Sequence, residues 1–295
     1  MTKVKNYLSL IKFSHTIFAL PFALIGFVLG INYLKSEMED VQIEFNFYSY
    51  TFLFVLLCMI FARSAAMAFN RYLDRSFDEK NPRTAIREIP AGIISANSAL
   101  LFTVVTSLLF IITTYFINLL CFYLSPVALL VVLGYSFTKR FTPLCHLVLG
   151  LGLSLAPIGA YLAVTGAFAL LPILFSFTVL FWVSGFDIIY ALQDEEFDKK
   201  YQLKSIPVWL GKNKALRVSE LLHLLCALCV IAAGWLGGFD LWYWIGALLF
   251  IGLLVYQHLL VKPNDLTKVN MAFFTTNGIA SVVFAVFVIV DILIS

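Results

Sequence analysis

Long apolar stretches, separated by short polar ones, run along the whole chain. A helix needs about 20 mostly apolar residues to cross the hydrocarbon core of a bilayer. Nine such stretches occur, so the pattern predicts an all-α membrane protein with nine transmembrane helices. The expected spans are 11–34, 48–70, 96–117, 119–137, 144–164, 169–192, 215–236, 241–261 and 266–294.

Basic residues predict the orientation of these helices. Cytoplasmic loops of membrane proteins carry an excess of Lys and Arg. With a cytoplasmic N-terminus, all of the 20 Lys and Arg residues except Lys35 and Arg63 fall in cytoplasmic segments. A wrong helix count would scramble this pattern, so we expect the N-terminus inside and the C-terminus outside. The first apolar stretch continues as a full span, so no cleavable signal peptide is expected.

Composition supports a membrane protein and narrows its partners. Hydrophobic residues make up 61% of the chain and charged residues 13%, whereas soluble domains carry roughly 25% charged residues. The net charge of +3 is small and dispersed, so no nucleic-acid partner is expected. The five cysteines are expected to be buried, inert thiols.

The first acidic motif, residues 70–78, follows the second expected span. Asn70, Asp74 and Asp78 recur at intervals of four residues, which places them on one face of a helix. Like charges at this spacing repel each other. One such pair is weak evidence for a site, because a solvated helix end explains it equally well.

The second acidic motif, residues 187–198, ends the sixth expected span. Asp187, Tyr190, Asp194 and Asp198 form a second helical stripe on the same side of the membrane. Two such motifs favour a site, because carboxylates in membrane segments are functional by default. Oxygen ligands favour Mg²⁺, which is often shared with substrate phosphates. The repetition indicates duplicated halves within a single domain, 1–295.

Two charges are expected at membrane depth, where each costs at least about 2.5 kcal/mol. These are Arg63 and Asp187, and we assign both to a pocket for the acceptor substrate. A structural ion pair is the alternative. Basic residues beside the motifs can stabilise a departing diphosphate, although they also fit the orientation signal.

Three segments resemble motifs of one family. Residues 70–84, Asn-Arg-Tyr-Leu-Asp-Arg-Ser-Phe-Asp-Glu-Lys-Asn-Pro-Arg-Thr, resemble the first aspartate-rich motif of the UbiA-type aromatic prenyltransferases. Residues 190–198, Tyr-Ala-Leu-Gln-Asp-Glu-Glu-Phe-Asp, resemble the second, and residues 135–140, Tyr-Ser-Phe-Thr-Lys-Arg, are similar to the basic segment closing the fourth helix. The resemblance covers essentially the whole chain.

The resemblance implies a UbiA-like helical bundle with Mg²⁺ as cofactor. The implied catalytic and metal-binding residues are Asn70, Asp74, Asp78, Asp194 and Asp198. Together with the charge pattern, it gives the candidate substrate-binding residues Lys139, Arg140, Asp187, Arg63, Tyr190 and Arg75. The aromatic candidates for stabilising an allylic cation are Tyr72, Tyr135, Phe186 and Tyr190.

The implied reaction transfers a polyprenyl group from a polyprenyl diphosphate to a small aromatic acid. It would occur at the cytoplasmic face of the inner (plasma) membrane, with the prenyl tail among membrane lipids. Residues 87–90, Arg-Glu-Ile-Pro, replace the Arg-Pro-Leu-Pro of many relatives. Together with residues 12–23, they resemble a bacterial subgroup related to both 4-hydroxybenzoate polyprenyltransferases and enzymes of the futalosine route to menaquinone. The acceptor therefore stays open between 4-hydroxybenzoate and a 1,4-dihydroxy-6-naphthoate type, for ubiquinone or menaquinone.

Three alternatives remain at this point. The acceptor could be a haem, a chlorophyll-like ring or a glycerol phosphate. The chain could instead be a membrane carrier, although carriers bind near the bilayer midplane and these carboxylates are expected at the inner helix ends. A non-catalytic protein that binds polyprenyl diphosphate could use the same carboxylates, and it would yield no prenylated product.

Overall fold

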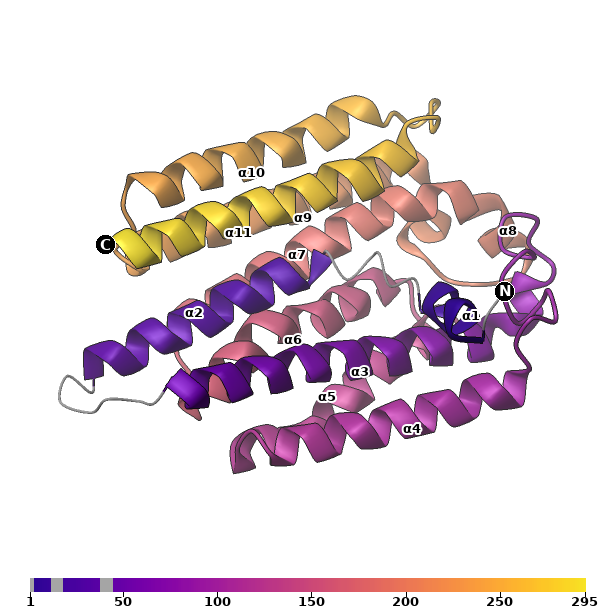
Figure 1. The fold of residues 1–295 in the computed structure, drawn as a ribbon. Coiled ribbons are helices and arrows are strands. Elements are labelled where there is room, and N and C mark those ends of the chain that lie inside the picture. The colour runs from indigo at the N-terminus through magenta and orange to yellow at the C-terminus, as the bar shows by residue number, and fades with distance from the viewer. Residues whose placement is uncertain (1–2, 12–17, 38–44) are drawn as a thin grey trace. The chain divides into compact units, whose positions relative to one another are not determined.

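The computed structural model describes residues 3–11, 18–37 and 45–295, and nearly all of its secondary structure is helical (Figure 1). The helices form two compact units. Unit 1 comprises Met1–Thr16 and Tyr50–Phe137, and unit 2 comprises Ile17–Ser49 and Thr138–Ser295. Residues 12–17, where the first expected span begins, lie outside the described residues.

Unit 1 contains the first acidic motif. Its helices are α1 (Lys3–Leu10), most of α3 (Phe45–Asp78), α4 (Ala96–Tyr115) and α5 (Leu119–Thr138). Helix α4 begins where the Ser95 hydroxyl accepts a hydrogen bond from the Ser98 N–H at 3.1 Å, which satisfies one of the free amides of the first turn. Leu10 of α1 is buried with Ala68 of α3 and Ala99 of α4, so the N-terminal helix is anchored by apolar packing.

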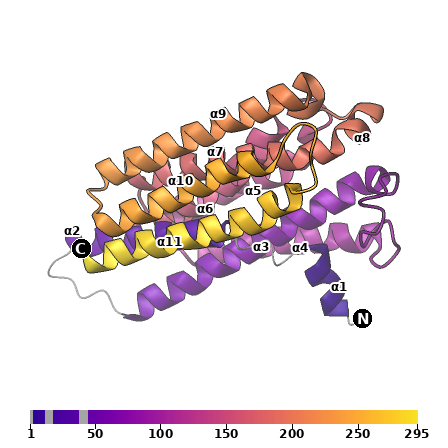
Figure 2. The ribbon, with the colours of Figure 1, turned by 90° about the horizontal axis from the view of Figure 1, so that it is seen from above.

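Unit 2 contains the second acidic motif and most of the remaining chain. Its elements are α2 (Leu20–Glu37), α6 (Cys145–Thr165), α7 (Leu170–Ala191), the 3₁₀ turn η2 (Leu192–Asp194), α8 (Glu195–Lys200), α9 (Ile206–Leu236), α10 (Leu241–Leu260), the π-helix η3 (Met271–Thr276) and α11 (Asn277–Ile294). Helix α10 packs beside α11, and α7 packs beside both α6 and α9 (Figures 1 and 2).

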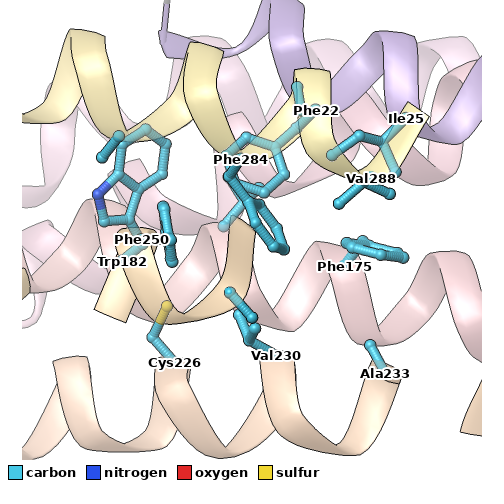
Figure 3. Close-up of a cluster of buried hydrophobic side chains, with 14 of the residues drawn as sticks. Phe22, Ile25, Phe175, Trp182, Cys226, Val230, Ala233, Phe250, Phe284 and Val288 are labelled. Carbon is cyan, nitrogen blue, oxygen red and sulfur yellow. The ribbon is translucent and has the colours of Figure 1, made fainter. Parts of the chain in front are cut away.

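Aromatic residues fill the centre of unit 2 (Figure 3). The rings of Phe250 and Phe284 lie 4.9 Å apart, and Trp182 lies 5.8 Å from Phe250. Within this apolar cluster, the Trp182 indole N–H donates to Asn277 Oδ1 at 2.8 Å, and the Gln257 amide donates to the same oxygen at 2.7 Å. Because buried polar groups need partners, these bonds fix how α7, α10 and α11 pack together.

Among the described residues, eight helices are long and apolar enough to cross a membrane. Helix α2 contributes a shorter apolar helix, Leu20–Ser36. The prediction of an all-helical integral membrane protein is confirmed, while the count of nine spans and the orientation stay predictions. Two helices exceed their expected spans: α3 continues past residue 70 to Asp78, and α9 begins at Ile206 rather than near residue 215.

Candidate functional site

The first motif lies on an unbroken helix. Because α3 runs without interruption to Asp78, the four-residue spacing places Asn70, Asp74 and Asp78 on one helical face, as the sequence predicts. The Asn70 amide Nδ2 donates to Asp74 Oδ2 at 2.9 Å. This bond orients the Asp74 carboxylate with a donor one helical turn before it.

Asp78 is buried and carries a specific cation partner. Its side chain is only 7% exposed, and its Oδ1 accepts a hydrogen bond from Arg87 Nη1 at 2.6 Å. Thr84 Oγ1 also donates to the backbone carbonyl of Asp78 at 3.2 Å, which brings the following segment back onto the helix end. Asp78 Oδ2 is buried without a hydrogen-bond partner among the described residues. A further cation or donor would satisfy this oxygen.

Arg75 and Arg63, two predicted substrate-binding residues, also lie on α3. Arg75 is exposed and folds onto its own helix, where Nη1 donates to the Tyr72 carbonyl at 2.6 Å and the guanidinium lies 4.5 Å from the Tyr72 ring centre. Arg63 precedes Asn70 by two helical turns and is half-buried. The helix therefore continues the polar face of the motif into the apolar span.

The second motif is not a continuous helical stripe, which corrects the expectation from its spacing. Helix α7 ends at Ala191, η2 follows, and α8 begins at Glu195. Asp187 and Tyr190 thus lie on α7, Asp194 closes the 3₁₀ turn, and Asp198 lies on α8. The 3₁₀ turn changes the rise and rotation per residue, so spacing alone does not keep these side chains in one row.

Asp198 repeats the arrangement seen at Asp78. Its side chain is 2% exposed, and its Oδ2 accepts a hydrogen bond from Lys139 Nζ at 2.9 Å. Burial opposes the charge on Lys139, but the Asp198 carboxylate outweighs this and raises the pKa of Lys139 above its ordinary value. The predicted substrate-binding residue Lys139 is therefore a charged partner of a predicted metal ligand. Arg140 follows it in the same turn after α5 and is half-buried.

Asp187 has a partner that the sequence did not reveal. His146, the second residue of α6, lies with Nδ1 2.6 Å from Asp187 Oδ2. The imidazole is 1% exposed and the Asp187 side chain 21% exposed. In the sequence, His146 is one of four scattered histidines without ligand spacing, so no pattern assigns it to the site. Asp187 thus has a hydrogen-bond partner on a neighbouring helix.

Aromatic rings gather beside the second motif. The ring centre of Tyr190 lies 4.2 Å from that of Phe273, and Phe186 lies 5.2 Å from Phe273. Phe18 lies 5.8 Å from both Phe186 and Phe273. Phe273 belongs to the π-helix η3, and π-helical turns are frequent at functional sites. Two of the predicted aromatic candidates, Phe186 and Tyr190, thus belong to one cluster in unit 2.

Comparison with known proteins identifies the family. Residues 19–279 match the UbiA prenyltransferase family. The chain belongs to this family. The resemblance drawn from the two aspartate motifs is therefore confirmed, and with it the prediction of a prenyltransferase-family protein.

Relatives of this UbiA-family chain have similar lengths. It is 34% identical over 239 residues to a 4-hydroxybenzoate octaprenyltransferase of Tolumonas auensis, with 80% of this chain and 83% of the relative covered. A 4-hydroxybenzoate octaprenyltransferase of Nitrosomonas europaea is 32% identical, with 78% of each chain covered. These relatives match most of the chain.

Solved structures of the family have the same fold. A UbiA homologue from Aeropyrum pernix superposes with a TM-score of 0.77 at 26% identity, with 95% of this chain and 98% of the homologue covered. A UbiA homologue from Archaeoglobus fulgidus, bound to DMAPP and Mg²⁺, gives a TM-score of 0.72 at 21% identity, with 98% and 100% covered. The predicted UbiA-like fold is confirmed.

The donor set suits Mg²⁺ only together with a further ligand. Among the described residues, no three His, Cys, Asp or Glu side chains form a group that could hold a metal ion. Magnesium takes oxygen ligands and is usually bound by one or two carboxylates plus substrate phosphates and water. Each motif supplies such carboxylates, and the unpartnered Asp78 Oδ2 is a suitable ligand atom. The residues therefore fit a metal that arrives with a phosphorylated substrate rather than a preformed protein cage.

Proposed function

We propose that this protein transfers a polyprenyl group from a polyprenyl diphosphate to a hydroxylated aromatic acid, with 4-hydroxybenzoate as the first candidate acceptor. The observation that carries this proposal is the pair of buried, cation-bound aspartates, Asp78 and Asp198, each ending an acidic motif of a UbiA-family chain. The names of the relatives support the acceptor. A 1,4-dihydroxy-6-naphthoate type acceptor is the second candidate, because residues 87–90 depart from the motif of many relatives.

Both motifs would bind the diphosphate within a single domain built from two related halves. The proposed metal- and diphosphate-binding residues are Asn70, Asp74, Asp78, Asp194 and Asp198. The homologue bound to DMAPP and Mg²⁺ supports this assignment by family membership. When bound, magnesium would neutralise charge on the diphosphate and so favour its departure.

The basic residues complete the proposed substrate site. Lys139 is charged beside Asp198 and can bind the diphosphate as it accumulates negative charge. Arg140 and Arg75 are assigned the same role at the ends of their helices. Arg63 is proposed to bind the carboxylate of the acceptor, because a guanidinium pairs well with a carboxylate.

An allylic cation needs a dry, aromatic environment. Water would quench it, and aromatic faces stabilise cations by roughly 0.5–2 kcal/mol each. Tyr190 and Phe186, which pack with Phe273, are the proposed aromatic residues on α7. The apolar helices would hold the prenyl tail in contact with membrane lipid. The excess of basic residues on one side supports an inner-membrane protein whose site faces the cytoplasm.

The test uses purified protein in lipid nanodiscs with Mg²⁺, a polyprenyl diphosphate and a panel of aromatic acids. We expect a prenylated product, identified by mass spectrometry, whose formation is lost in Asp74→Ala and in Asp194→Ala. Asp265→Ala is the matched control, because Asp265 is a fully exposed loop carboxylate outside both motifs, and it should leave turnover unchanged. Normal turnover in both motif variants would refute the site. Metal-dependent lipid binding without product from any acid would instead support the non-catalytic alternative.

A further inference from the structure

The imidazole of His146 is held from three directions within unit 2. It lies at the start of α6, its Nδ1 contacts Asp187 of α7, and its Nε2 accepts a hydrogen bond from the backbone N–H of Ile206, the first residue of α9, at 3.4 Å. Because Nε2 acts as the acceptor, the ring proton of the neutral imidazole lies on Nδ1. His146 therefore donates its Nδ1 proton to Asp187 Oδ2.

Residues 204–206, next to His146, make several hydrogen bonds with neighbouring segments. The backbone N–H of Lys204 donates to the Lys139 carbonyl at 2.7 Å, and the Cys145 thiol lies 3.6 Å from the Lys204 carbonyl. Ser205, fully buried, caps α9 next to Ile206. These contacts connect the turn that contains Lys139 to the start of α6, where His146 contacts Asp187. The position of the imidazole is thus set by backbone contacts as well as by packing.

Asp187 presents one carboxylate oxygen that no described residue contacts through a hydrogen bond. Its Oδ2 is occupied by His146, and Oδ1 accepts no hydrogen bond from any described residue. The side chain is 21% exposed, although its neighbours Phe186 and Ile188 on α7 are almost fully buried. Asp187 directly follows Phe186, a member of the aromatic cluster described above. Its oriented carboxylate, with one accessible oxygen, is arranged to accept a hydrogen bond from a planar polar ligand.

We propose that Asp187 accepts the hydrogen bond of the acceptor's ring hydroxyl and that His146 is the positioning residue that fixes Asp187 for this contact. The inference rests on the proposed function and adds a residue pair for the acceptor. As the allylic C–O bond breaks, its electron pair leaves with the diphosphate. The ring carbon next to the hydroxyl forms the new C–C bond, and the hydroxyl proton passes to Asp187. The resulting dienone loses its ring proton, Asp187 returns the proton to the oxygen, and one proton is released in total.

If Asp187 has this role, the reaction rate should depend on the presence of the acceptor's hydroxyl proton. Asp187→Asn should lower kcat with 4-hydroxybenzoate by about 100-fold, the usual scale for a lost acid–base group. The parent should discriminate strongly between 4-hydroxybenzoate and 4-methoxybenzoate, which has no hydroxyl proton. Asp187→Asn should lose most of this discrimination, whereas a residue with a purely structural role would reduce both rates alike.

His146 is tested by a matched pair of variants. His146→Asn keeps an N–H donor near the Nδ1 position, and His146→Leu removes it. We expect His146→Leu to lower kcat/KM for the acceptor by roughly 10-fold or more, with the KM for the polyprenyl diphosphate unchanged, and His146→Asn to recover most of the loss. Thermal unfolding of each variant reports on folding separately. If His146→Leu does not fold, His146→Asn and Asp187→Asn decide the proposal.

The outcomes separate this inference from the proposed function. Absence of product from the parent with every aromatic acid would overturn both. Normal parent activity, with unchanged acceptor kinetics and unchanged discrimination in Asp187→Asn, would overturn only the role of Asp187. Equal acceptor kinetics in parent, His146→Asn and His146→Leu would overturn the positioning role of His146 while leaving the prenyltransferase intact.

Discussion

The first acidic motif ends a continuous α-helix and finds its partners nearby, whereas the second spans a 3₁₀ turn and is held by distant residues. In the first, Asn70 binds Asp74 four residues on, and Arg87 binds Asp78 nine residues before it. In the second, Lys139 lies 59 residues from Asp198 in sequence. The same chemical grouping is thus built once from local contacts and once from long-range contacts.

Both versions share a buried final aspartate whose carboxylate accepts a hydrogen bond from a cationic side chain. An unpaired buried charge is strongly unfavourable, so each carboxylate needs a positive partner even without a ligand. The partner can come from any part of the chain, because neutralising the charge matters more than its origin. In the proposed function, the same cation also binds a diphosphate that brings its own metal. The comparison indicates that charge balance, rather than helix geometry, is the common feature of the two motifs.

The largest expected effect comes from removing the two cations. Lys139→Met should lower the free energy of unfolding by about 3 kcal/mol, since it leaves the nearly inaccessible Asp198 unpaired. Arg87→Met should cost about 2 kcal/mol, because Asp78 is slightly more exposed. Thermal unfolding in one detergent, at neutral pH, measures both.

A double variant provides the control for this comparison. Lys139→Met combined with Asp198→Asn removes the buried charge along with its partner, so stability should recover in part. If Lys139→Met alone is as stable as the parent, Asp198 does not depend on its distant partner, and the contrast between the motifs fails.

A smaller effect is expected from the helix that follows the second motif. Gly211 of α9 has φ 74° and ψ 163°, a conformation open essentially to glycine alone, and a Cβ there would meet no atom within 4 Å. Gly211→Ala should therefore cost about 1–2 kcal/mol through backbone strain alone. Gly134 of α5 also has open space around it but no positive φ. Gly134→Ala should instead stabilise unit 1 by about 0.4–1 kcal/mol.

Urea or thermal unfolding measures the change in stability of the two glycine variants, and so compares the regular helix around Gly134 with the kink at Gly211. Opposite signs are expected. Stabilisation by both alanines to the same extent would mean that Gly211 requires no glycine-specific conformation, and that the surroundings of the second motif are as regular as those of the first.

Local patterns predicted the parts of this protein that depend on local physics. Hydropathy identified every long helix, because each span must be apolar by itself, and four-residue spacing placed Asn70, Asp74 and Asp78 on one face. Spacing alone does not fix the direction of the Asp194 side chain, because a 3₁₀ turn interrupts the helical period there. The pairing of His146 with Asp187 was not predictable, since it joins residues 41 apart on different helices and leaves no periodic signal.

The smallest effect is expected at the contact between α8 and α9. Lys212 Nζ lies 3.8 Å from Glu195 Oε2, a long separation between side chains that are 32% and 22% exposed. Solvent screens such a pair, and Glu195→Gln should change the free energy of unfolding by less than about 1 kcal/mol. Helix α8 is held more firmly by backbone bonds, including that from the Leu203 N–H to the Asp198 carbonyl at 2.8 Å. The difference between parent and variant should vanish in high salt. A loss comparable to that of Lys139→Met, persisting in salt, would show that this surface pair, and not the buried one, holds the second motif in place.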